Sequence, residues 1–136
     1  MVGHDFDFDY RKLAAASRAV ASGAAFVAVN VDPRLPMEAG EFCPGCGSLV
    51  EAVASASGTR PEVVGKPMPS IFHAALARLA VPPDAAVMIG DSLASDVRGA
   101  QAVGLKAIWL APPDGVASGV QPDLTIHAFA ELTGRL

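Results

Sequence analysis

The stretch Val87–Asp96 (VMIGDSLASD) constrains the fold of this chain most strongly. It begins as an apolar run typical of a buried strand, and Asp91 follows directly after Gly90. Asp96 comes five positions later, where we expect a helix to begin. Because α/β proteins bind ligands in the crevice at the carboxyl ends of their parallel strands, both carboxylates are predicted to face such a crevice. Two carboxylates beside open space suit Mg²⁺, which keeps waters and substrate phosphate oxygens as its other ligands.

A lysine is the third part of this candidate site. Lys66 follows a short apolar run, Val63–Val64, and precedes Asp91 by one predicted helix and one predicted strand. A lysine at the end of a strand can face the same crevice. We therefore expect Lys66 to meet the negative charge of a bound phosphate.

Strand and helix patterns alternate along the chain, which favours a parallel sheet covered by helices. Residues 32–36, with two prolines, are predicted to be a loop because they can continue neither kind of element. The predicted helices cover residues 10–22, 48–56, 69–80 and 96–103, with a last helical turn at 128–132, and the predicted strands cover residues 24–31, 60–64, 86–90, 106–110 and 124–126.

Three blocks of this pattern carry a resemblance to a known family. Gly65-Lys66-Pro67, then a helix, then Gly90-Asp91-Ser92 with Asp96, resembles the third and fourth motifs of the haloacid dehalogenase (HAD) superfamily of phosphatases. Further upstream, the segments 26–33, 44–47 and 64–67 are similar to the NagD-like, p-nitrophenylphosphatase-type branch, which carries a large α/β cap domain. The resemblance implies an α/β fold: part of an α/β cap over residues 1–64, then half of a Rossmann-like HAD core with a parallel sheet over residues 65–136.

The resemblance also implies roles for the candidate site. In the family, an aspartate attacks phosphorus and forms a phosphoaspartyl intermediate that water then hydrolyses. Asp91 would ligate Mg²⁺, and Asp96 would support the waters of the metal or orient Lys66. Lys66 would neutralise the nucleophile and the phosphate oxygens, with Ser92 close enough to help bind the substrate. The alternative is that Lys66 is an ordinary surface lysine and that the two acids only favour the start of a helix.

In this branch the cap selects the substrate, a small phosphorylated metabolite. Asn30, Asp32 and the loop Cys43–Gly47 match cap positions that face the core, so Asn30, Asp32, Gly45 and Gly47 are the candidate substrate-binding residues. Small residues in such a loop let the backbone approach a substrate closely. The competing interpretation is that these residue types were selected for turn geometry alone.

The nucleophile of the family is not identified in this sequence. The segment Asp5–Asp9 contains Asp-x-Asp twice, but only Met1-Val2-Gly3 precedes it, too short for the buried strand that a nucleophile motif follows. We interpret this segment as a solvated acidic turn that caps the helix from Tyr10, with a makeshift nucleophile as the alternative. The chain therefore resembles the C-terminal half of a phosphatase and is expected to be inactive or weakly active alone.

Half of a parallel sheet would leave the strand ending at Asp91 with an unpaired edge. Three arrangements would resolve this: a longer polypeptide that supplies a complementing N-terminal half, a homodimer, or a sheet rearranged to include residues 24–31. The rival to an enzyme is a non-catalytic remnant that binds Mg²⁺ or phosphate, or that self-associates.

Composition excludes several classes of partner. A net charge of −4 gives no electrostatic reason to bind nucleic acid or an anionic membrane, and no apolar run reaches the ~18 residues of a membrane helix. The N-terminus lacks a secretory signal, so a cytoplasmic location is the default expectation. Cys43 and Cys46 have no second pair to complete a zinc site, a redox role is disfavoured, and no glycine-rich dinucleotide-binding turn follows a strand.

Overall fold

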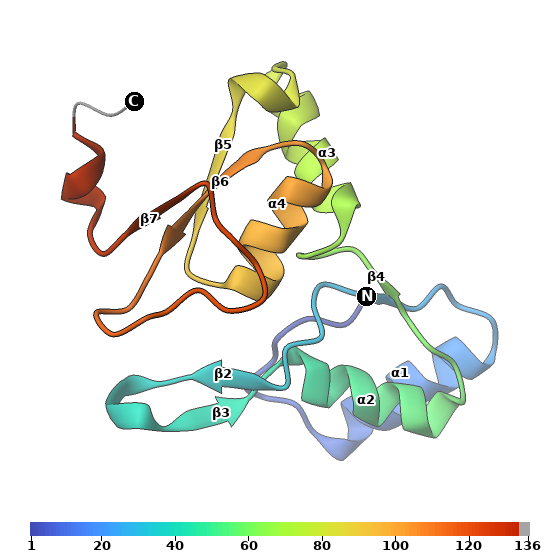
Figure 1. Cartoon of the computed structure of the whole chain (residues 1–136). Helices are drawn as coiled ribbons and strands as arrows, with labels where there is room; N and C mark the ends of the chain where they lie inside the picture. The colour runs from blue at the N-terminus through green and yellow to red at the C-terminus, as the bar shows by residue number, and fades with distance from the viewer. Residues whose placement is uncertain (134–136) are drawn as a thin grey trace. The chain divides into compact units, whose positions relative to one another are not determined.

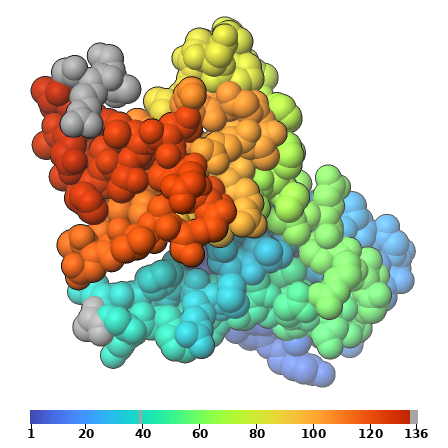
Figure 2. All heavy atoms as spheres, in the orientation of Figure 1, coloured from blue at the N-terminus to red at the C-terminus, as the bar shows by residue number. Residues whose placement is uncertain are grey.

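The computed structural model describes residues 1–133, apart from the side chain of residue 39, and it divides the chain into two compact units (Figure 1). Unit 1 is Met1–Gly65 and unit 2 is Lys66–Leu136. Figure 2 shows the heavy atoms of the chain as spheres, in the colours of Figure 1. The chain is a mixed α/β protein with parallel strands, as predicted. The assignment of unit 1 to a cap and of unit 2 to half of a catalytic core stays a prediction.

Unit 1 holds two helices, a small parallel pair of strands and a hairpin. Its parallel pair, β1 with β4, is extended by a bridge from Val2 to Ala28, and its hairpin joins β2 to β3 in antiparallel register. The elements are α1 (Tyr10–Ala21), β1 (Val27–Ala28), β2 (Arg34–Pro36), the 3-10 turn η1 (Glu38–Gly40), β3 (Phe42–Pro44), α2 (Cys46–Ser57) and β4 (Glu62–Val63).

The two helices of unit 1 begin and end where local chemistry dictates. Asp9 caps α1, because its carboxylate accepts a hydrogen bond of 2.8 Å from the backbone N–H of Lys12. This confirms the prediction of an acidic cap before Tyr10. Gly58 ends α2 in the left-handed conformation, at φ 71°, which glycine adopts without strain. The helices pack on β1 through a core of buried side chains: Phe26, Ala28, Cys46, Val50, Val53 and Ala54.

Two predictions for unit 1 were wrong. The apolar run 24–31 forms only the short strand β1, because its partner strand β4 is only two residues long. The predicted loop 32–36 contains β2, which pairs with β3 in register Leu35↔Cys43. Proline is tolerated there because both strands of an isolated hairpin are edge strands, so the missing N–H of Pro36 interrupts no ladder beyond the pair.

Unit 2 is built around a three-stranded parallel sheet of order β5-β6-β7. The register pairs Gly90, the last residue of β5, with Trp109 of β6. The elements are α3 (Pro69–Leu79), the 3-10 turn η2 (Pro83–Ala85), β5 (Val87–Gly90), the π-helical turn η3 (Leu93–Val97), α4 (Arg98–Ala102), β6 (Lys106–Leu110), β7 (Leu124–Ile126) and the 3-10 turn η4 (Phe129–Leu132).

Helices α3 and α4 lie against one face of this sheet and η4 lies on its other side (Figure 1). The side chains of the sheet therefore divide between two buried clusters. The larger cluster contains Phe72, Leu76, Val97, Ala100, Leu105, Ala107, Trp109 and Ala111, and the smaller contains Ile108, Ile126 and Leu132. Trp109 and Ile108 face opposite sides, as neighbours on a strand must.

The helix predicted to start at Asp96 was placed incorrectly. Asp96 lies inside the π-helical turn η3, and α4 begins only at Arg98. The carbonyl of Ser92 accepts hydrogen bonds from the backbone N–H groups of both Asp96 (2.9 Å) and Val97 (3.2 Å). The first turn is therefore wider than an α-helical turn, a feature that often accompanies functional sites.

One edge of the sheet in unit 2 is free. Strand β5 pairs with β6 on one side, and no strand within residues 1–133 pairs with its other side. The expected unpaired edge beside Asp91 is thus present in the structure. Within residues 1–133, no helix is both long enough and apolar enough to cross a membrane.

Candidate functional site

Lys66 and Asp96, both predicted site residues, form a close ion pair. The Nζ of Lys66, just before α3, lies 2.6 Å from Oδ1 of Asp96 in η3. The Asp96 side chain is only 2% exposed, whereas that of Lys66 is 46% exposed. Oδ1 accepts no hydrogen bond from the described residues, so the ion pair with Lys66 compensates its burial. A buried carboxylate thus holds a half-exposed ammonium group in place.

The second oxygen of Asp96 ties this pair to the turn that carries Asp91. Oδ2 of Asp96 accepts a hydrogen bond of 3.1 Å from the backbone N–H of Ser92. The Ser92 hydroxyl in turn accepts from the backbone N–H of Ser95 at 3.2 Å and caps η3. Asp91, at the carboxyl end of β5, is exposed, and no side chain within residues 1–133 pairs with its carboxylate. The structure therefore places three of the predicted residues, Lys66, Ser92 and Asp96, in direct contact and leaves the adjacent Asp91 carboxylate open.

Sequence reasoning missed the role of Gly90. A Cβ built on this residue would overlap the side chain of Asp96. Glycine is therefore required so that η3 can fold back onto the end of β5 and bring the Asp96 carboxylate to the turn. The spacing of a glycine directly before an acid was visible in the sequence, but the close approach was not.

Sequence reasoning also missed Trp109. Its indole Nε1–H donates a hydrogen bond of 2.9 Å to the backbone carbonyl of Asp91, and the residue is 5% exposed. The register of β6 against β5 places this side chain beside the end of β5. A tryptophan in an otherwise apolar strand was the available signal, because buried tryptophans usually find an acceptor.

The donor set at the end of β5 fits a magnesium ion. Within residues 1–133, no three His, Cys, Asp or Glu side chains gather into a cluster that could hold a metal by protein ligands alone. Mg²⁺ does not need such a cluster, because one or two carboxylates suffice when waters and phosphate oxygens complete the octahedron. The open carboxylate of Asp91 could supply such a ligand, whereas both oxygens of the buried Asp96 already contact Lys66 and the Ser92 N–H.

Three of the candidate substrate-binding residues come together in unit 1. Asn30, Asp32 and Gly45 line one pocket of about 230 Å³, which His4 and Arg34 also line. Oδ1 of Asn30 is buried and has no hydrogen-bond partner among the described residues. This pocket therefore combines a buried, unpartnered acceptor in its wall with the side chains of His4, Arg34 and Asp32.

Gly45 and Gly47 are small for a reason that the sequence did not indicate. A Cβ on Gly45 would overlap the backbone of Asp32 and Arg34, and one on Gly47 would overlap the carbonyl of Val31. The backbone N–H groups of the two glycines donate to the carbonyls of Pro33 and Asp32, both at 2.9 Å. The close approach that these glycines permit is thus to the chain itself.

The two cysteines of unit 1 are free thiols. Cys43 lies in β3, and Cys46 lies buried at the start of α2, where its Sγ is 3.8 Å from the carbonyl of Val2.

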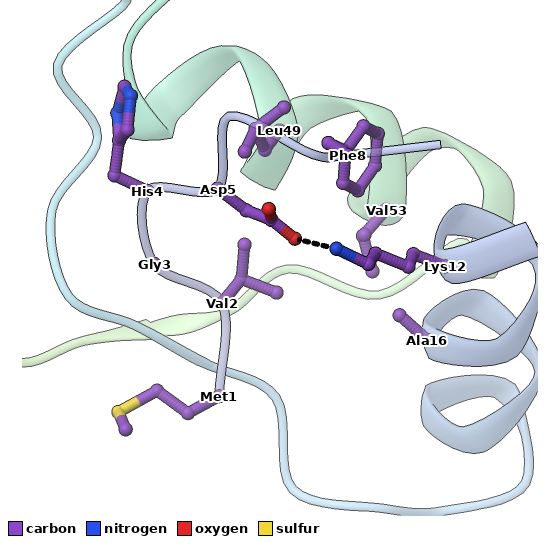
Figure 3. Close-up of a pocket in the computed structure, with 10 residues that line it drawn as sticks. All are labelled: Met1, Val2, Gly3, His4, Asp5, Phe8, Lys12, Ala16, Leu49 and Val53. Atoms are coloured by element: carbon purple, nitrogen blue, oxygen red, sulfur yellow. Dashed lines mark hydrogen bonds and ion pairs between the residues drawn. The ribbon is translucent and has the colours of Figure 1, made fainter. Parts of the chain in front are cut away.

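Two of the three acids in the segment before α1, Asp5 and Asp9, are engaged in local pairing. The Asp5 carboxylate lies 2.7 Å from Nζ of Lys12, and Figure 3 shows the two side chains pointing toward each other at a pocket of about 310 Å³. The hydrogen bond from Lys12 lowers the pKa of Asp5, with a smaller contribution from the backbone N–H of Asp7. Asp9 is used as the helix cap. These contacts match the interpretation of a solvated acidic turn.

Comparison with known proteins finds a matching family model and also relatives that are named as phosphatases. The model of the HAD-hydrolase-like family matches residues 63–132. D-glycerol 3-phosphate phosphatase from Mycobacterium tuberculosis is 46% identical over 98 residues, which are 72% of this chain and 27% of that protein.

Solved structures agree with the sequence comparison. The p-nitrophenyl phosphatase from Archaeoglobus fulgidus matches with a TM-score of 0.88 and 26% identity, over 99% of this chain and 55% of that one. A glycerol phosphate phosphatase from Mycobacterium tuberculosis in complex with magnesium matches with a TM-score of 0.72 and 42% identity, over 79% of this chain and 32% of that one. The chain spans well under two thirds of the length of each of these relatives.

Proposed function

This chain belongs to the HAD-like hydrolase family, among relatives that are phosphatases, and we propose that it is the C-terminal part of a Mg²⁺-dependent phosphatase acting on a small phosphomonoester. The contact between Lys66 and Asp96 beside the open Asp91 carboxylate carries this proposal. Phosphoryl transfer depends mainly on positioning and on neutralisation of charge around the transferring group. A buried acid that fixes a lysine next to an exposed acid provides both.

Each residue of unit 2 has a distinct role in this proposal. Asp91 is the ligand that holds Mg²⁺, and Asp96 orients Lys66 and supports the metal site from its buried position. Lys66 keeps enough exposure to reach a phosphate oxygen, and Ser92 lies beside the same turn. Bound Mg²⁺ would neutralise charge on the phosphate oxygens and orient the substrate.

The pocket in unit 1 supports the assignment of Asn30, Asp32 and Gly45 to substrate selection. The guanidinium of Arg34 suits the charge of a small polar substrate, and the buried Oδ1 of Asn30 is an acceptor with no partner in the described residues. Relatives named for glycerol phosphate and for p-nitrophenyl phosphate make these two compounds the first to test. Gly47 acts indirectly here, because it allows α2 to begin against residues 31–32.

The attacking carboxylate is proposed to come from outside the residues described here. The free edge of β5 supports this, because a further parallel strand that pairs there would end beside Asp91. A complementing N-terminal half of a longer polypeptide would supply such a strand. The same free edge favours a second candidate function, a non-catalytic, self-associating protein in which β5 pairs with a second copy of the chain.

The decisive experiment is a chimera in which this chain replaces the matching segment of an active relative. The matching segment of the Mycobacterium tuberculosis D-glycerol 3-phosphate phosphatase is replaced by residues of this chain, and hydrolysis of glycerol phosphate and p-nitrophenyl phosphate is measured with and without Mg²⁺. We expect Mg²⁺-dependent turnover that falls by at least about 100-fold with Asp91→Asn, because the metal would lose its carboxylate ligand. A folded chimera whose turnover survives Asp91→Asn would contradict the proposal.

The isolated chain provides the matched control. We expect it to hydrolyse p-nitrophenyl phosphate no faster than its Asp91→Asn variant. If it does turn over, Asp5→Asn and Asp7→Asn variants show whether the acidic turn supplies the nucleophile. Light scattering of the same sample separates the second candidate, which requires a stable dimer.

A further inference from the structure

We propose that Trp109 is a positioning residue for the candidate metal site, and this inference rests on the proposed function. Its indole N–H holds the peptide group between Asp91 and Ser92 in one orientation, so that the Asp91 carboxylate is aimed before a metal arrives. Trp109 does not touch substrate or metal in this proposal. It acts through the backbone of the residue that does.

The peptide group in question is held from both sides. Its carbonyl, from Asp91, accepts the hydrogen bond of 2.9 Å from Trp109 Nε1. Its N–H, from Ser92, donates the hydrogen bond of 3.1 Å to Oδ2 of Asp96. A peptide group is planar, so fixing both its donor and its acceptor fixes the torsion angles on either side. Those torsion angles set the direction in which the Asp91 side chain points relative to this peptide group.

The two anchors of this peptide group come from different parts of unit 2. Trp109 lies in the middle of the sheet, on β6, and Asp96 lies in η3 with its other oxygen paired to Lys66. One continuous set of contacts therefore runs from the sheet through the 91–92 peptide to the lysine. An exposed turn after a strand is normally among the more mobile parts of a fold, and this arrangement restrains it.

The burial of Trp109 makes the hydrogen bond matter. At 5% exposure, water cannot replace the indole donor, and an unmade hydrogen bond would leave a buried polar N–H. A purely apolar side chain at this position could face the same core but would leave the Asp91 carbonyl without this donor. The tryptophan thus contributes something to the turn that packing alone does not require.

The test removes only the donor. Trp109 is the sole tryptophan of the chain, so growth on benzothienylalanine, whose ring sulfur replaces the indole N–H, changes this one site. Trp109→Phe is the genetic counterpart, and Leu76→Val, in the same buried cluster, is the control for loss of packing alone. Two quantities are measured by NMR: the exchange rate of the Ser92 amide without metal, and the affinity for Mg²⁺ alone.

We expect the Ser92 amide to exchange about tenfold faster without the indole donor, and the affinity for Mg²⁺ to fall about tenfold, as when supporting partners of metal ligands are removed. Leu76→Val should change neither quantity beyond its effect on global stability. Unchanged Ser92 exchange, or Mg²⁺ affinity equal to that of the unmodified chain, would overturn the inference.

The failure of the proposed function would look different. If the unmodified chain shows no response to Mg²⁺ at all, the metal site itself is refuted. The restraint of the turn by Trp109 would then be tested by the exchange rate of the Ser92 amide alone, which is measured without metal. Retention of the Trp109 indole proton against solvent exchange in the unmodified chain is a further requirement.

Discussion

Gly90 and Asp96 are packed so closely that no side chain fits between them: a Cβ on Gly90 would overlap the Asp96 carboxylate. This relationship explains how the Asp96 carboxylate reaches the turn that carries Asp91. The last residue of β5, Gly90, has no side chain, so η3 can pack directly against the end of the strand. The buried carboxylate can then reach both Lys66 and the backbone of the turn.

Gly90→Ala is therefore expected to destabilise the protein by about 2 kcal/mol, because the added methyl group overpacks a site that holds a charged, buried partner. Urea denaturation measures the free energy of unfolding. In an Asp96→Gly background the obstacle is gone, and Gly90→Ala should cost less than about 0.5 kcal/mol. Equal costs in both backgrounds would show that the clash with Asp96 is not the cause.

Lys66→Met should destabilise the protein by about 1–3 kcal/mol, because it leaves the buried Asp96 carboxylate without its cation. The value is set below that of a fully buried pair because Lys66 is half exposed. The measurement is a double-mutant cycle with Asp96→Asn. A coupling energy near zero would mean that the two side chains do not interact in solution.

Gly47→Ala should destabilise unit 1 by about 3 kcal/mol or more, because the methyl group would meet the carbonyl of Val31, and backbone cannot move aside as a flexible side chain can. Gly3→Ala is the matched control, since a Cβ there would make only an ordinary contact of 3.6 Å with Val29. The stabilities of the two variants are compared by thermal unfolding. If Gly47→Ala is as stable as Gly3→Ala, the close approach of α2 to residues 31–32 is refuted.

Asp123 makes the stability of unit 2 depend on pH. The backbone N–H of Ala107 is the main cause that lowers the pKa of its carboxyl group from 3.8 to about 2, and Lys106 adds to it. Because the folded pKa lies below the unfolded one, this stabilisation is fully present above about pH 4 and is lost as the pH falls toward 2.

Asp123→Asn is accordingly expected to cost about 1 kcal/mol at pH 7, since the amide oxygen still accepts from Ala107 but no longer pairs with the Lys106 ammonium. The difference from the unmodified chain should shrink as the pH approaches 2. Urea denaturation at a series of pH values measures it. A difference that stays constant or grows toward low pH would contradict the assigned cause.

Much of unit 2 could be predicted from sequence because its signals are local. The strands β5, β6 and β7 are short, mainly apolar segments with glycine or proline nearby in the sequence, so their positions were found within about a residue. The contact between Lys66 and Asp96 was anticipated through the order of two motifs. The π-helical turn was not, because it depends on one carbonyl, that of Ser92, accepting two N–H groups.

The parts that could not be predicted depend on partners distant in sequence. The hairpin of β2 with β3 forms in a proline-rich segment because two edge strands meet, which no local pattern shows. The indole of Trp109 finds the Asp91 carbonyl only once β6 is in register with β5. The smallness of Gly45 and Gly47 was attributed to a substrate, whereas the chain itself fills the space.

The central claim, that the turn after β5 is half of a phosphatase metal site, is tested most directly by titrating the ¹⁵N-labelled chain with Mg²⁺ and following the backbone amide shifts. We predict saturable shifts concentrated in residues 90–96 that disappear in Asp91→Asn, while the rest of the spectrum of that variant is unchanged. Absence of these shifts in the unmodified chain, or their persistence in Asp91→Asn, would contradict the account.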